Sequence, residues 1–218
     1  MVATCPTSIT RAIVFASLYD FVFYIVKAID LCRDHFFVEN AEYDEPTVHA
    51  FTKILDHNYS KYTSDKLHDI RETIEPASLI PSKVFTGFKK ACHTYYKFDS
   101  KTEKDLAIML EDSSAVKKWL RPANGQFNIY WSNNSRMYVP DFVAETDTVI
   151  YLVETKADNE ISDTDTQAKA KAAVIWCDHA TKFTTANGGK LWKYSLIPQA
   201  KVMFNNDILK LLEEFKLD

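Results

Sequence analysis

The fold of this chain is decided by residues 138–156, which read Tyr-Val-Pro-Asp-Phe-Val-Ala-Glu-Thr-Asp-Thr-Val-Ile-Tyr-Leu-Val-Glu-Thr-Lys. Two β-prone segments, 137–144 and 149–156, flank the turn-forming residues 145–148. Both segments are largely apolar, but Asp141 interrupts the first, and Glu154 and Lys156 end the second. We therefore predict a β-hairpin that carries charged side chains on an otherwise apolar surface.

The charged residues of this hairpin are predicted to converge. Glu154 and Lys156 are two positions apart, so they share one face of their strand. If the turn is centred on Thr146 and Asp147, Asp141 lies opposite Leu152 and diagonal to Glu154. Two neighbouring carboxylates repel each other and are costly to bury, and a divalent cation relieves both costs. A structural hairpin whose charges pair with one another is the alternative.

Magnesium suits such a site because it prefers oxygen ligands and keeps several waters. A bound Mg²⁺ polarises a phosphoryl oxygen and lowers the pKa of a water. Lys156 beside it is placed to orient or deprotonate that water, or to neutralise developing charge. The pattern therefore indicates metal-assisted hydrolysis of a phosphodiester.

The flanking sequence predicts the rest of an α/β fold. Ser100-Lys-Thr-Glu103 is a capping box that begins a helix ending near Glu111 or extending to Leu120. Further predicted elements are a strand at 126–131, a turn at 132–135, a helix at 165–180, a turn at 187–189, a strand at 191–197 and a helix at 206–216. Tight turns indicate an antiparallel meander of three strands, and the helix before the fourth strand indicates a crossover. We expect a mixed sheet flanked by helices, in the order αβββαβ.

The N-terminal part has helical signals and little chemistry. Predicted helices are 12–33, 44–59, 64–74 and 82–96. We predict residues 1–97 to be a helical connector or accessory region and residues 98–218 to be the catalytic domain. The apolar stretch 12–29 contains Asp20 and Lys27, which favours a packed helix over a membrane span.

Composition adds weaker constraints. The formal net charge of −4 argues mildly against a nucleic-acid partner, although a local basic patch can be diluted by an acidic remainder. The four cysteines are Cys5, Cys32, Cys92 and Cys177. Their wide spacing argues against a zinc site or a disulfide framework and favours a reducing cytoplasm.

The region 97–198 resembles the PD-(D/E)xK nucleases, and among them the endonuclease domain at the C-terminal end of type III restriction enzyme cleavage subunits. The resemblance is carried by three stretches: Tyr138-Val-Pro-Asp-Phe142, Tyr151-Leu-Val-Glu-Thr-Lys156, and Gln167-Ala-Lys-Ala-Lys-Ala-Ala173 with the nearby Trp176. The order αβββαβ is also that of the restriction-endonuclease-like core.

The resemblance implies a role for each candidate residue. Asp141 and Glu154 would bind the metal, Lys156 would be the catalytic lysine, and Glu103 would complete the site, with the capping box as its alternative role. On the crossover helix, Gln167, Lys169 and Lys171 would contact the DNA backbone. The alternative for these three is a solvated charged face around an alanine stripe.

The resemblance also implies partners. It predicts an endonuclease for duplex DNA that uses Mg²⁺, or Mn²⁺ in its place, together with a modification methyltransferase subunit and a helicase motor. The motif GxxxxGK[ST] is absent from the sequence, so this chain has no ATP site of that kind. We expect a fragment of a larger motor-nuclease, or else a freestanding relative. Two other functions stay open: a catalytically inactive DNA- or protein-binding module, and a scaffold whose N-terminal helices bind a partner protein.

Overall fold

The computed structural model describes residues 25–29, 51–56, 64–127, 129–131 and 136–217. The chain divides into two compact units, Met1–Thr47 and Val48–Asp218. In the first unit residues 25–29 are helical, as predicted for 12–33, and the rest of that prediction lies outside the described residues. No helix in the described ranges is long and apolar enough to cross a bilayer.

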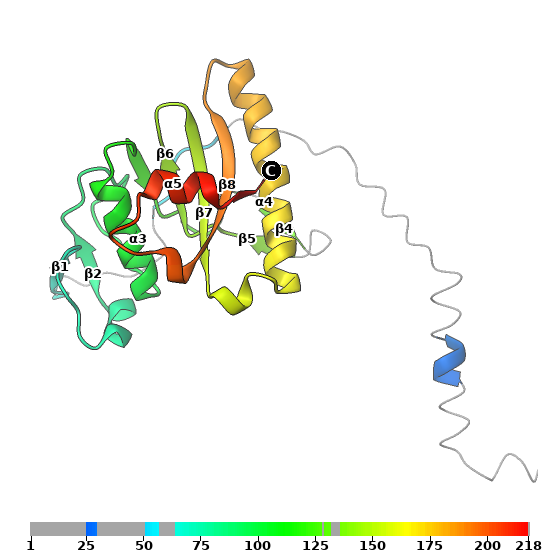
Figure 1. The fold of residues 1–218 in the computed structure, drawn as a ribbon, viewed down its shortest axis with the longest axis horizontal. Coiled ribbons are helices and arrows are strands. Elements are labelled where there is room, and N and C mark those ends of the chain that lie inside the picture. The colour runs from blue at the N-terminus through cyan, green and yellow to red at the C-terminus, as the bar shows by residue number, and fades with distance from the viewer. Residues whose placement is uncertain (1–24, 30–50, 57–63, 128, 132–135, 218) are drawn as a thin grey trace, which may run out of the picture. The chain divides into compact units, whose positions relative to one another are not determined.

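The second unit is built on a mixed five-stranded sheet (Figure 1) with the order β3-β6-β7-β8-β9. These strands are β3 (Lys118–Leu120), β6 (Phe142–Glu145), β7 (Val149–Lys156), β8 (Leu191–Pro198) and β9 (Lys216–Leu217). Strands β7 and β8 are parallel, and the other neighbours are antiparallel. The helices are α3 (Lys101–Asp112), α4 (Thr164–Ala186) and α5 (Ile208–Glu214). The predicted mixed α/β architecture, a mixed sheet flanked by helices, is confirmed.

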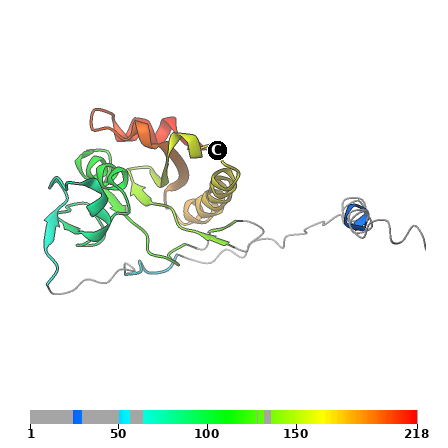
Figure 2. The ribbon, with the colours of Figure 1, turned by 90° about the horizontal axis from the view of Figure 1, so that it is seen from below.

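Alternation along β7 gives the sheet two apolar faces. Tyr151 and Val153 belong to the cluster that contains the buried residues of α3 and α5. Leu152 belongs to the other cluster, with Ala170 and Ala173 of α4. Helices α5 and α4 therefore lie on opposite sides of the sheet (Figure 2), and both faces of β7 are buried. This explains why β7 reads as a nearly continuous apolar run.

The cap of α3, strand β7 and the crossover helix α4 follow the prediction closely. The Ser100 hydroxyl accepts a hydrogen bond from the Glu103 N–H (3.1 Å), so the N-terminal cap of α3 is confirmed. Strand β7 has the predicted bounds, and α4 crosses over to the parallel strand β8. The helix α3 ends at Asp112, so its possible extension to Leu120 is wrong because residues 118–120 form β3.

The first two strands predicted for the sheet, 126–131 and 137–144, differ from the observed strands. Residues 129–131 form β4 (Ile129–Trp131), which pairs with β5 (Arg136–Tyr138) in a separate two-stranded ribbon. The first strand of the meander is instead β3. The predicted strand 137–144 is divided into β5 and β6 around Pro140, whose missing N–H cannot join a ladder. The predicted turn 132–135 lies outside the described residues.

The helices predicted for 44–59, 64–74 and 82–96 are wrong wherever the structure describes them. Residues 51–56 have no regular secondary structure. The segment 64–74 contains β1 (Leu67–Asp69), and the segment 82–96 contains β2 (Val84–Thr86). The 3₁₀ helix η1 (Ala77–Ser82) lies between β1 and β2, and η2 (Asp158–Glu160) and η3 (Gln199–Lys201) are short 3₁₀ turns farther along the chain. Ile70, Phe85 and Tyr96 are fully buried in the cluster that includes α3. The expected boundary near residue 97 thus lies inside one compact unit, where packing outweighs helix propensity.

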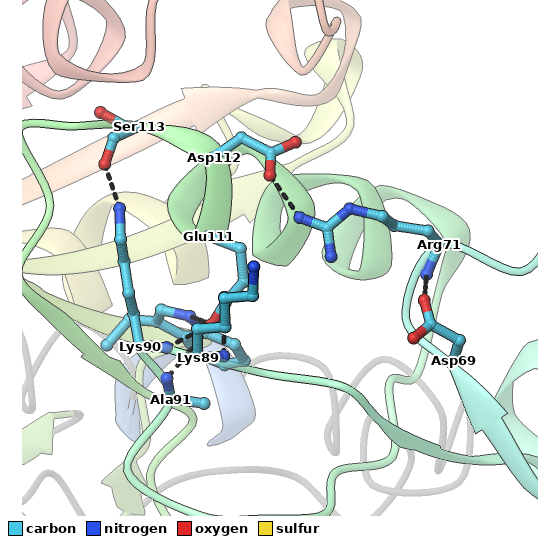
Figure 3. A network of polar contacts seen from close by, with 9 residues as sticks. Asp69, Arg71, Lys89, Lys90, Ala91, Glu111, Asp112 and Ser113 are labelled. Atoms are coloured by element: carbon cyan, nitrogen blue, oxygen red, sulfur yellow. Dashed lines mark hydrogen bonds and ion pairs between the residues drawn. The ribbon is translucent and has the colours of Figure 1, made fainter.

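A buried carboxylate joins this N-terminal part to α3 and β3 (Figure 3). Glu111 is 6% exposed. Its side chain accepts hydrogen bonds from the backbone N–H groups of Lys89 (2.9 Å), Lys90 (3.0 Å) and Ala91 (3.2 Å), and from the Trp119 indole (2.7 Å). These four donors come from two separate segments, so Glu111 holds the loop 89–91 against the first strand of the sheet.

Candidate active site

The hairpin β6–β7 places Asp141 next to Glu154. Phe142 pairs with Val153, and Glu145 pairs with Ile150. Continued by one position, this register puts Asp141 opposite Glu154 and not opposite Leu152, the partner predicted from the sequence. The difference arises because the turn is centred one residue later than expected, with Thr146 bonding across it to Val149.

The three predicted residues of the hairpin meet at one end of the sheet. The Lys156 ammonium lies 2.7 Å from Oε1 of Glu154. Oδ2 of Asp141 accepts hydrogen bonds from the backbone N–H and the hydroxyl of Thr155, at 2.8 and 2.9 Å. Tyr138 donates to Oε2 of Glu154 at 2.9 Å. The convergence of Asp141, Glu154 and Lys156 that was expected from the sequence is therefore present.

Burial and repulsion dominate the electrostatics of this hairpin. Burial, reinforced by the neighbouring Asp141 carboxylate, raises the pKa of Glu154 from 4.5 to about 7. Burial also raises the pKa of Asp141, although the hydrogen bonds from Thr155 oppose the shift. For Lys156, burial lowers the pKa, but the Glu154 carboxylate outweighs it and the net pKa is raised. The lysine is therefore held as an ammonium.

Glu103 reaches this region from the other side of the sheet. Its Oε2 accepts from the Asp99 N–H (3.0 Å) and lies 2.9 Å from the Arg121 guanidinium. Burial raises its pKa from 4.5 to about 7 against the opposing charge of Arg121, and Asp141 contributes to the rise. Within the described residues no hydrogen bond or ion pair joins Glu103 to Glu154, and the Asp141 carboxylate contributes to the raised pKa of each. Glu103 thus acts in the cap of α3 and in an ion pair with Arg121.

A cleft of about 390 Å³ opens beside Asp141. Lys97, Arg121 and Asn124 line it together with the Val139–Asp141 segment. Arg121 is held there by Asp99, Glu103 and the Lys97 carbonyl. The cleft therefore borders Asp141, and charged groups of both signs, Lys97, Arg121 and Asp99, lie along its wall.

The donor set suits a hard cation. Across the described ranges no cluster of three or more His, Cys, Asp or Glu side chains is arranged as a complete metal cage. Magnesium, however, is commonly held through one or two carboxylates and completed by waters and phosphate oxygens. Asp141 and Glu154 supply two such carboxylates, and their mutual repulsion is what a cation would relieve. Glu103 is instead held by the Arg121 guanidinium at 2.9 Å.

The three predicted DNA-binding residues of α4 make contacts of their own, away from the carboxylates. Gln167 is exposed and donates to the Ile161 carbonyl at 2.7 Å, so it closes the turn before α4. Lys169 lies over the Trp131 ring at 4.8 Å, which is a cation–π contact. Lys171 is exposed. The structure does not bring any of the three into contact with the carboxylates.

Sequence reasoning missed four residues of this neighbourhood: Arg121, Tyr138, Thr155 and Tyr194. Thr155 lies between the two motif residues, and its backbone proximity to Asp141 follows from the corrected register. Tyr138 begins the stretch Tyr138–Phe142 that carries the resemblance, but no role was predicted for it. Arg121 and Tyr194 carry no local signal, because their contacts join segments far apart in the chain.

The raised carboxyl pKa values predict an unusual dependence of stability on pH. A carboxyl group whose folded-state pKa is about 7 binds more protons in the folded than in the unfolded state between pH 4.5 and 7. In this window its contribution to the free energy of unfolding decreases as pH rises. We therefore expect Glu154→Gln to be more stable than wild type by about 1 kcal/mol near pH 8, and the difference to vanish toward pH 5.

Urea unfolding of both proteins across this pH range measures the effect. Asp178→Asn, an exposed carboxylate on α4, is the matched control and should follow wild type at every pH. Equal stabilities of wild type and Glu154→Gln near pH 8 would contradict the prediction.

Comparison with protein-family models, with curated proteins and with solved structures gives no match for this chain.

Proposed function

We propose that this chain is a metal-dependent endodeoxyribonuclease of the PD-(D/E)xK class. The observation that carries the proposal is the convergence of two carboxylates, the partly buried Asp141 and the buried Glu154, with an ammonium 2.7 Å from Glu154 and a cleft lined by Asp141. A buried pair of like charges is costly without a cation. Hydrolysis of a phosphodiester needs this combination of anionic metal ligands and a positive charge.

Each residue has a role in the proposed reaction. Asp141 and Glu154 would hold Mg²⁺, or Mn²⁺ in its place, with Glu103 as a further ligand once it leaves Arg121. When bound, the cation supplies Lewis-acid polarisation of the phosphoryl group and a more acidic water. Lys156 is an ammonium, so it orients the attacking water and neutralises charge on the phosphate. That protonated state favours electrostatic stabilisation over proton abstraction.

The arrangement of elements supports the finer fold assignment. Along the chain, α3, β3, β6, β7, α4 and β8 follow the order αβββαβ, and the ribbon β4–β5 is inserted between the first two strands of the sheet. We propose that this is a restriction-endonuclease-like core. The candidate ligands lie at the end of the β6–β7 hairpin, where that class carries them.

The proposed setting is a type III restriction system. A modification methyltransferase subunit would choose the DNA sequence, and a helicase motor would bring the nuclease to its target. Gln167, Lys169 and Lys171 would then support the DNA backbone from α4, with duplex DNA as the substrate.

A non-catalytic binding module is the second candidate function. The observation that favours it is that Lys156 and Arg121 already neutralise Glu154 and Glu103 without a metal. In such a module the ion pairs would stabilise the sheet end, and DNA or a protein would bind without being cleaved.

A cleavage assay on supercoiled plasmid separates the two functions. We expect nicking by wild type in Mg²⁺ or Mn²⁺, and none in the presence of a chelator. Asp141→Asn should reduce nicking by about a thousandfold, since one ligand and its charge are lost. The matched control Asp178→Asn should cleave as wild type. Metal-dependent DNA binding without nicking would favour the binding module.

A further inference from the structure

Two buried tyrosines are linked to Glu154 through their hydroxyl groups. The hydroxyl of Tyr138 donates to Oε2 of Glu154 at 2.9 Å, and the hydroxyl of Tyr194 lies 3.3 Å from that of Tyr138. Tyr138, Tyr194 and Glu154 are 5%, 1% and 5% exposed. The hydroxyl groups and the carboxylate therefore form a line of hydrogen bonds inside the apolar cluster that α4 covers.

The direction of this line follows from counting hydrogens. A phenol has a single hydroxyl hydrogen. Tyr138 uses its hydrogen on Glu154, so in the contact between the two hydroxyls Tyr194 is the donor and Tyr138 the acceptor. The line runs from Tyr194 to Tyr138 to Glu154, and each bond strengthens the next one.

The two oxygens of Glu154 have different partners. Tyr138 engages Oε2, and Lys156 engages Oε1. Lys156 is the more exposed of these partners, with 27% of its side chain accessible, so Oε1 is the oxygen that can exchange its partner. The tyrosines thus hold Oε2, and Oε1 is held by Lys156 alone among the contacts of the described residues.

Tyr138 also lies outside the sheet that carries Glu154. It ends the ribbon β4–β5, in which the exposed Tyr130 pairs with the exposed Met137. A shift of this ribbon therefore moves the donor that holds Glu154.

We propose that Tyr138, supported by Tyr194, is a positioning residue that orients Glu154 so that Oε1 can take a divalent cation in place of Lys156. The inference rests on the proposed function, because it assigns Glu154 as a metal ligand. It adds that the ribbon β4–β5, which ends at Tyr138, takes part in setting the orientation of this ligand.

Direct titration with Mn²⁺, followed by calorimetry, is the test. We expect Tyr138→Phe to bind Mn²⁺ about tenfold more weakly than wild type, the cost of one hydrogen bond to a charged group. Tyr194→Phe should weaken Mn²⁺ binding in the same direction but about threefold, since it acts through Tyr138. Tyr130→Phe, an exposed tyrosine of the same ribbon, is the matched control and should bind as wild type.

Cleavage kinetics supply a second measurement. With Tyr138→Phe, the Mn²⁺ concentration for half-maximal cleavage should rise, while cleavage at saturating Mn²⁺ stays within about threefold of wild type. A purely structural tyrosine would lower the urea midpoint without changing Mn²⁺ affinity in the folded protein. If Tyr138→Phe proves too unstable to titrate, Tyr194→Phe decides the question by the same comparison.

The outcomes separate this inference from the proposed nuclease. Unchanged Mn²⁺ affinity in both tyrosine variants, together with loss of binding in Asp141→Asn, overturns the inference and supports the metal site. Weakened binding in the tyrosine variants without plasmid cleavage by wild type supports the inference and overturns the nuclease. Absence of any Mn²⁺ binding by wild type overturns both.

Discussion

Replacement of Lys156 by methionine is expected to lower the rate of DNA cleavage by about a thousandfold, because it removes one group that stabilises charge in the transition state. Methionine keeps much of the side-chain length and removes only the charge and its hydrogen bonds. The cleavage rate on supercoiled plasmid at saturating Mg²⁺ measures this effect.

The same variant should keep its metal. Lys156 occupies Oε1 of Glu154 at 2.7 Å, so it competes with a cation for that oxygen. Its removal raises the pKa of Glu154 further above about 7, since Lys156 is one of the groups that lower it. At about pH 8.5 the carboxylate still ionises in the presence of a cation, and Mn²⁺ should bind at least as tightly as to wild type.

This combination distinguishes Lys156 from Asp141, whose replacement should abolish both cleavage and Mn²⁺ binding. Lys182→Met, which removes an exposed lysine of α4, is the matched control and should change neither property. Wild-type cleavage by Lys156→Met would exclude the lysine from the reaction.

The largest effect on stability is expected at Glu111, far from the proposed chemistry. Glu111→Ala leaves four N–H donors of the loop 89–91 and of Trp119 without their acceptor. Each orphaned buried donor costs about 1–3 kcal/mol, and water reaching the loop recovers part of it. We expect the free energy of unfolding to fall by about 3–5 kcal/mol, a large part of the stability of a typical domain.

Urea unfolding monitored by tryptophan fluorescence measures this loss. Glu111→Gln should lose about 2 kcal/mol, because the amide keeps one acceptor oxygen but turns its NH₂ toward other donors. The control is the neighbouring Asp112→Asn, whose ion pair with Arg71 is exposed on both sides and contributes less than about 1 kcal/mol. Equal losses for Glu111→Ala and Asp112→Asn would contradict the structural role of Glu111.

The segment after residue 98 shows how far local signals reach. The Ser100 cap, the bounds of β7 and the crossover helix α4 were predicted because each depends on neighbours in the chain: a hydroxyl three residues from an N–H, an apolar run, an alanine-rich period. Local sequence also explains why the hairpin residues of the candidate site could be predicted. Glu154 and Lys156 share a face by strand alternation alone, and Asp141 follows from a hairpin register that was in error by one position at the turn.

Other features were decided only by contacts between distant segments. The helices predicted for 64–74 and 82–96 are absent because Ile70 and Phe85 complete the core beneath α3 and because Glu111 takes the N–H groups of the loop 89–91. The third carboxylate of the candidate site, Glu103, is held by Arg121, which lies eighteen positions along the chain and directly follows β3. The ion pair of Glu103 with Arg121 and the hydrogen bonds from Tyr194 to Tyr138 to Glu154 form between segments that are far apart in the sequence and are brought together by packing. The sequence alone therefore determined which residues carry the proposed chemistry, and the tertiary structure decided how each is oriented and charged, because burial and long-range hydrogen bonds depend on neighbours that the local pattern does not contain.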